Sequence, residues 1–246
     1  LGPVSAGAAD GDDLEPEFVD INRRHMAVVS FQEDNHLAVV DLRRGRTTSQ
    51  FSAGSVDLRL VDVVEDDLIS FDGALTKRRE PDAVAWSDDD SFATANEGDY
   101  EDAAGVELES GESFEHWVAS AGHYNEGRSE NKGVEPESAE VGTFQGTTYL
   151  FVGSERSNLV GVYEMGKRGL EPVQLLPTGI GPEGVKAVPR RGLLAVSTET
   201  DAADIGIPTM ITIYAYGKGR AAYPMISSAD DASGAPTGEV DSSDES

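Results

Sequence analysis

The sequence predicts an all-β protein, a β-propeller built from four recognisable blade-like repeats, one of which is incomplete or shortened. Three observations support this fold class. A short proline phrase recurs four times, each copy is followed by short strand-like runs rich in Val, Thr, Tyr and Phe, and no long stretch shows helical periodicity. The four phrases are Glu15-Pro16-Glu17, Glu80-Pro81-Asp82, Glu135-Pro136-Glu137 and Gly181-Pro182-Glu183.

Each phrase precedes two or three expected strands. The second run of each repeat is apolar and ends close to a glutamate; these runs are Met26–Ser30, Ser91–Ala95, Thr148–Val152 and Leu193–Ser197. Three repeats add a third run, at Leu37–Leu42, Leu159–Tyr163 and Met210–Tyr214. Successive prolines of the phrases are 65, 55 and 46 residues apart. A four-stranded blade takes roughly 40–50 residues, so the first two repeats carry insertions.

The composition along the chain predicts three regions. We expect an N-terminal extension over residues 1–13, the propeller domain over 14–217, and an acidic flexible tail or linker over 218–246, where Gly, Ser, Ala and Asp dominate. Between Asn96 and Lys132 the strand pattern is weak, which predicts a shortened or missing blade there.

The charge narrows the class of partners. Asp and Glu number 46 against 19 Lys and Arg, which gives a net charge of −27. Such a surface repels phosphate backbones and anionic headgroups, so we expect no nucleic-acid partner and no direct insertion into a membrane. Only five of the cationic residues are lysines. This composition fits a halophilic protein kept soluble in high salt, and equally an acidic secreted protein from an ordinary marine source.

The repeated phrases predict a metal site. Equivalent positions of propeller blades lie around one axis, so the repeated carboxylates should gather at one mouth of it. Hard oxygen ligands in variable number favour Ca²⁺. The alternative is that these side chains cap turns or pair with arginines between blades. The candidate ligands in the phrases are Glu15, Glu17, Glu80, Asp82, Glu135, Glu137 and Glu183, and those at strand ends are Glu97, Glu155 and Glu199, with Glu33 at the matching place in the first repeat.

A second group of polar residues precedes the third repeat. His123, Arg128 and Lys132 lie within ten residues of one another in an expected loop. Arg and Lys suit the anionic part of an ester, and His suits proton transfer, so these three are the candidate catalytic residues. The alternative is an ordinary loop with Arg–Glu pairs.

The ordered motifs resemble a known family. The segments that carry the resemblance are Glu80–Ala85, Thr94–Asp99, Lys132–Glu137 and Gly181–Gly184. Over residues 14–216 the chain is similar to the extracellular β-propellers called choice-of-anchor I proteins, which resemble mesenchyme-specific cell-surface glycoproteins and occur with the esterase-like phytase domain. Relatives have a longer segment between the second and third motifs than the thirty or so residues found here.

The resemblance implies an extracellular, periplasmic or cell-surface protein that binds Ca²⁺ and acts on phosphoesters or other anionic esters. Its partners would be a small anionic ester or a cell-surface polymer, and in longer relatives a C-terminal phytase-esterase-like domain. Two other readings remain open. One is a binding or scaffold propeller without catalysis, and the other is a lactonase-like sugar-acid enzyme.

Overall fold

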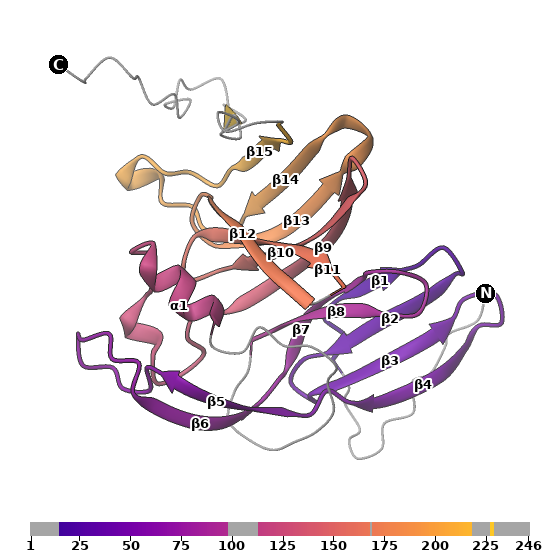
Figure 1. Cartoon of the computed structure of the whole chain (residues 1–246), viewed down its shortest axis with the longest axis horizontal. Coiled ribbons are helices and arrows are strands. Elements are labelled where there is room, and N and C mark those ends of the chain that lie inside the picture. Colours follow the sequence, from indigo (N-terminus) through magenta and orange to yellow (C-terminus); the bar gives the residue numbers. More distant parts are fainter. Residues whose placement is uncertain (1–14, 98–112, 168, 218–226, 229–246) are drawn as a thin grey trace.

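The computed structural model describes residues 15–97, 113–167, 169–217 and 227–228 and confirms an all-β, propeller-like fold (Figure 1). The expected extension at 1–13 and nearly all of the expected tail at 218–246 lie outside the described residues. Three of the four repeats form four-stranded antiparallel sheets, here called the first, third and fourth blades. The expected strands are present in all four repeats.

The first blade comprises β1 (Val19–Ile21), β2 (Met26–Phe31), β3 (His36–Asp41) and β4 (Arg46–Ser52). The third comprises β9 (Pro136–Phe144), β10 (Thr147–Ser154), β11 (Leu159–Gly166) and β12 (Gly169–Pro177). The fourth comprises β13 (Pro182–Val188), β14 (Leu193–Thr198), β15 (Ile211–Ala215) and the two-residue β16 (Ser227–Ser228). In each blade neighbouring strands are consecutive in sequence, as in a meander.

The second blade is the shortened one. Its sheet contains β7 (Pro81–Trp86) and β8 (Phe92–Asn96), and a separate ribbon of β5 (Ser55–Val61) and β6 (Gly73–Arg78) precedes it. Toward the third blade the described chain forms the helix α1 (Ser113–Ser120) and a short 3-10 turn instead of strands.

Helix α1 was not expected from the sequence, because eight residues are too few to give a clear helical period. Its buried residues Phe114 and Val118, four positions apart, pack in the core beside the second and third blades. Gly161 on β11 makes room for the helix, since a Cβ there would lie 2.6 Å from the Phe114 ring. Within the described part of the chain, no helix has the length and apolar character needed to cross a membrane.

The innermost strands of the blades are neighbours in the order β1, β7, β9 and β13. Each begins at or just after the proline of its repeat. The core fills the spaces between blades. One cluster lies between the first and second blades, one between the second and third beneath α1, and one between the third and fourth. The repeats therefore stack around a common axis, and their equivalent ends point to the same mouth.

Two asparagines connect successive blades. Asn35 and Asn158 lie at equivalent turns of the first and third blades, with φ of 51° and 55°, which asparagine tolerates better than most residues. The side-chain oxygen of Asn35 accepts a hydrogen bond from the backbone N–H of Glu80, and that of Asn158 from the N–H of Gly181, both at 3.0 Å. Each bond fixes the entry of the next innermost strand.

In three of the four repeats the residue before the proline has an unusual backbone conformation. Proline favours an extended predecessor, yet φ is 41° at Glu80, 45° at Glu135 and 69° at Gly181. The carbonyls of these three residues accept hydrogen bonds from the N–H groups of Glu97, Glu155 and Glu199, at 3.2, 3.0 and 2.9 Å. Tertiary hydrogen bonds thus hold a backbone conformation that a glutamate adopts only with strain.

The variant Asn158→Ala should destabilise the protein by about 1–3 kcal/mol, because it leaves the Gly181 N–H without its partner. Urea unfolding followed by circular dichroism measures this. Gln145→Ala is the control, since Gln145 also has a positive φ, of 51°, but is exposed in a hairpin. Equal effects of the two variants would show that backbone strain, and not the bond between blades, determines the loss.

Candidate metal centre

The starts of the innermost strands bring one group of carboxylates together. The residue after each repeat proline is acidic, at Glu17, Asp82, Glu137 and Glu183. The electrostatic influence of Glu17 reaches both Asp82 and Glu183, although these three residues belong to three different blades. The innermost strands of three blades therefore bring these carboxylates within electrostatic reach of one another.

The neighbourhood of Asp82 opposes ionisation. Burial, followed by the charges of Glu97, Glu183 and Glu17, raises the pKa of Asp82 to about 7, against a smaller opposite effect of Lys132. Burial, with Glu199 and Glu17, also raises the pKa of Glu183. A carboxyl group in such a place keeps its proton near neutral pH or attracts another cation.

Glu137 and Glu155 form the most strongly perturbed pair. Burial, the hydrogen bond to Glu155, and the charges of Glu155, Glu97 and Asp82 raise the pKa of Glu137 to about 9. Burial raises the pKa of Glu155 to about 7, opposed in part by its hydrogen bond to Glu137 and by the charge of Arg156. The two groups share protons, so the pair loses them in coupled steps.

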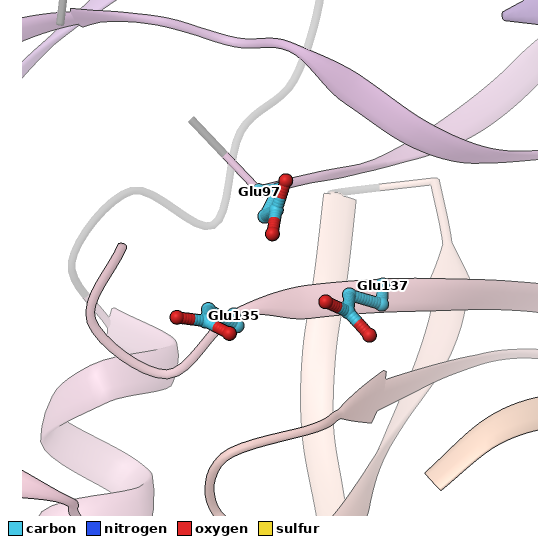
Figure 2. Close-up of side chains that lie close together, drawn as sticks. All are labelled: Glu97, Glu135 and Glu137. Carbon is cyan, nitrogen blue, oxygen red and sulfur yellow. The ribbon is translucent and has the colours of Figure 1, made fainter. Parts of the chain in front are cut away.

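Three glutamates approach closely enough to share one ion. An oxygen from each of Glu97, Glu135 and Glu137 lies within 4.8 Å of the others. Figure 2 shows Glu135 and Glu137 at the start of β9, with Glu97 facing them from the end of β8. The group joins the second and third blades.

Glu135 is already neutralised by the protein. Its side chain is fully buried, and it accepts bonds from Arg128 Nε and from Arg156 Nε, each at 2.6 Å. Two arginines against one carboxylate satisfy its charge and both of its oxygens. Glu135 therefore fits the alternative stated for the repeated carboxylates, an arginine pair in the interior, better than the role of a metal ligand.

Glu155 is satisfied on one side only. One carboxylate oxygen pairs with Arg156, while the other, Oε2, is buried and accepts from no N–H or hydroxyl group of the described structure, which leaves only the carboxyl of Glu137 as a donor when that group is protonated. The residue is 3% exposed. Such an oxygen needs a proton, which it shares with Glu137, or a cation from solution.

The remaining candidate ligands lie in different settings. Glu80 is buried next to the first blade, with its carboxylate 3.9 Å from Arg78. Glu199 is exposed but close enough to influence Glu155 and Glu183, whereas Glu15 is exposed at the start of the described chain. Glu33 lies exposed in a turn.

The candidate catalytic residues are engaged by the protein itself. Arg128 binds Glu135, and Lys132 Nζ lies 2.6 Å from Glu97 Oε1. His123 Nδ1 is 3.0 Å from the carbonyl oxygen of Ser157. Arg128 and Lys132 thus balance buried acids at the axis, and a catalytic role for the three residues stays a prediction.

Two residues of the site escaped the sequence analysis. Gln32 occupies the strand-end position of the first blade, which the other blades fill with glutamate, and it donates to Glu97 Oε2. Arg156 bridges Glu135 and Glu155. The repeat alignment could have identified Gln32, because it follows β2 as Glu97 follows β8. No sequence signal pairs Arg156 with Glu135.

A family comparison agrees with these repeats. The family model of the choice-of-anchor I domain matches residues 3–109 and 106–168. The chain belongs to the choice-of-anchor I domain family. Choice-of-anchor domains are typically associated with the cell surface. The relationship to the esterase-like phytase domain stays a prediction, and no curated protein matches the chain.

Solved structures give distant matches. Hydrazine synthase of Kuenenia stuttgartiensis has a TM-score of 0.48 at 14% identity, over 87% of this chain and 49% of that one. A functionally unknown protein of Desulfotomaculum acetoxidans has a TM-score of 0.42 at 14% identity, over 82% and 52%. A putative 6-phosphogluconolactonase of Bacteroides uniformis has a TM-score of 0.41 at 15% identity, over 85% and 55%. The chain spans about half the length of these proteins.

The raised pKa values make the stability of the metal-free protein depend on pH. Asp82, Glu137 and Glu155 hold protons in the folded state that the unfolded chain releases near pH 3.8 for Asp and pH 4.5 for Glu. These three groups therefore make their full contribution to the free energy of unfolding below about pH 4, and this contribution is lost as the pH rises to about 9. Thermal unfolding in EDTA should show a midpoint that falls from about pH 5 to about pH 9.

The variant Glu137→Gln should flatten this profile, because the amide needs no proton and removes one negative charge from the pair. A midpoint that stays constant or rises over the same interval would contradict the proposed crowding of carboxylates. Glu164→Gln, on an exposed position of β11, is the matched control and should leave the profile unchanged.

Proposed function

We propose that this chain is a surface-associated β-propeller that binds a divalent cation, Ca²⁺ in the first place, at the carboxylate mouth of its axis. The observation that carries the proposal is the buried Glu155 oxygen that no N–H or hydroxyl group satisfies, next to Glu137, whose charge Asp82 also opposes. A bound cation would neutralise charges that the protein leaves uncompensated.

The charge balance of the mouth supports a cation. Arg128, Lys132 and Arg156 pair with Glu135, Glu97 and Glu155. Within the described residues, no ion pair forms at Asp82, Glu137 or Glu183, and we take these three, together with Glu155 Oε2, as the candidate ligands. Because these four groups come from three blades, a cation between them would also connect the blades.

The donor set favours Ca²⁺ over Mg²⁺. It consists of carboxylate oxygens from different strands, with the exposed Glu17 and Glu199 at the rim open to water. Ca²⁺ accepts six to eight oxygens in irregular geometry, whereas Mg²⁺ demands a near-ideal octahedron. The chain has no Cys, and among the described residues no histidine belongs to a group of candidate ligands that would favour a transition metal.

An exported location fits the same proposal. Extracellular Ca²⁺ is abundant enough to fill a site of modest affinity, and the strongly acidic composition suits an exposed, soluble surface. The family supports an association with the cell surface. We propose that the mature propeller works outside the cell as a binding or scaffold module.

Calcium should raise the thermal stability of protein first treated with EDTA, at constant ionic strength. A ligand at about a hundred times its dissociation constant adds about 2.7 kcal/mol. The double variant Asp82→Asn, Glu137→Gln should lose most of this gain, while Glu164→Gln should keep it. A calorimetric titration with Ca²⁺ and Mg²⁺ gives the affinities directly. A stability that Ca²⁺ does not change, with no heat of binding, would refute the site.

Ester hydrolysis is the competing hypothesis, and the same preparation tests it. Because Arg128 and Lys132 already bind buried acids, we expect no Ca²⁺-dependent turnover of a chromogenic phosphate or carboxylate ester above the buffer rate. Turnover that Ca²⁺ induces and His123→Ala abolishes would establish the catalytic reading instead. His123→Ala is preferred to a change at Arg128, whose loss would leave Glu135 buried and under-compensated.

A further inference from the structure

A cavity lies at the ends of the innermost strands β1, β7, β9 and β13, opposite to the candidate metal centre. Its volume is 560 Å³. Its lining includes one residue from each blade: Ile21 at the end of β1, Trp86 at the end of β7, Val141 in β9, and Pro189 directly after β13. The metal candidates stand at the starts of these strands, and a strand of six residues such as β7 is about 20 Å long. The cavity is therefore the other mouth of the propeller axis.

Two arginines line this cavity from different blades. Arg23 follows β1 in the first blade, and Arg190 follows β13 in the fourth. Both are exposed, and in the described structure neither side chain forms an ion pair or hydrogen bond. Their guanidinium groups stay free although the chain carries 46 acidic residues against 19 basic ones.

The carboxylates of the same cavity are engaged elsewhere. Asp20 accepts hydrogen bonds from the backbone N–H groups of Ile21 and Trp86, at 2.8 and 2.7 Å. One oxygen of Asp88 accepts from the N–H groups of two residues in its own turn. Asp89 lies 3.3 Å from Nε of Arg24, which lies outside the cavity lining. The acidic side chains therefore bind groups of the cavity wall, whereas the two arginine side chains are available to bind a ligand.

We propose that this mouth binds a carboxylate-bearing sugar, of the kind that acidic surface polysaccharides contain. Guanidinium groups bind carboxylates through paired hydrogen bonds. Ile21, Trp86 and Pro189 offer apolar surface to a sugar ring, and the remaining lone pairs of Asp20 and Asp89 can accept hydroxyl groups. The volume suits one or two sugar units. The site is distinct from the proposed calcium site at the other end of the axis.

Calorimetric titration of the full chain with digalacturonate tests the proposal, and cellobiose and inorganic phosphate are the comparison probes. Digalacturonate should bind, more weakly as salt increases, and cellobiose should not. Arg23→Gln and Arg190→Gln should each lower the affinity about tenfold or more. Arg191→Gln is the matched control, because Arg191 belongs to the same 3-10 turn as Arg190 but does not line the cavity.

The outcomes separate clearly. No binding of digalacturonate, or equal binding by Arg190→Gln and Arg191→Gln, would overturn the proposal. Binding of phosphate as tight as that of digalacturonate would overturn the sugar specificity and leave a general anion site. Every titration is run in Ca²⁺ and again in EDTA. Binding of digalacturonate in both buffers would show that the sugar site does not depend on Ca²⁺, so it would stand even if the calcium proposal fails.

Discussion

Repulsion among carboxylates at the axis is the constraint on which the rest of this structure depends. The four repeats place an acidic residue directly after each proline, and three of them place another at the end of the next strand. Stacking the blades brings these groups into one partly buried mouth of the axis, where each additional negative charge destabilises the ionised form of its neighbours. Arg128, Arg156 and Lys132 neutralise part of this negative charge through ion pairs within the protein. The negative charge that stays unpaired gives this mouth its affinity for protons or cations.

The buried Glu135 shows how structure and function are divided within this mouth. It lies at a strained backbone position, and its carboxylate holds two arginines, one from the loop before β9 and one from the turn after β10. One of these arginines also holds Glu155 in place. Glu135 is thus a positioning residue, which fixes the loop and orients Glu155. The neighbouring Glu137, two residues later, has no such partner and faces the shared space (Figure 2).

The two ends of the axis differ in the charge that remains free. At the starts of β7, β9 and β13 the uncompensated groups are acidic, and at the other mouth, after the ends of β1 and β13, they are Arg23 and Arg190. A propeller that meets a cation at one mouth and an anionic sugar at the other would suit a module that recognises acidic polymers at a surface. The family membership agrees with that setting.

The sequence by itself determined the repeats and the strands, because period, β-propensity and proline phrases are local properties that recur. Tertiary structure decided the rest. The pairing of Arg156 with Glu135, the positive φ before the proline in three of the four repeats, and the short helix that packs Phe114 against Gly161 all depend on residues distant in sequence. Those contacts determine which glutamates the protein neutralises internally and which stay free for a ligand. The spacing of residues along the chain does not predict this difference.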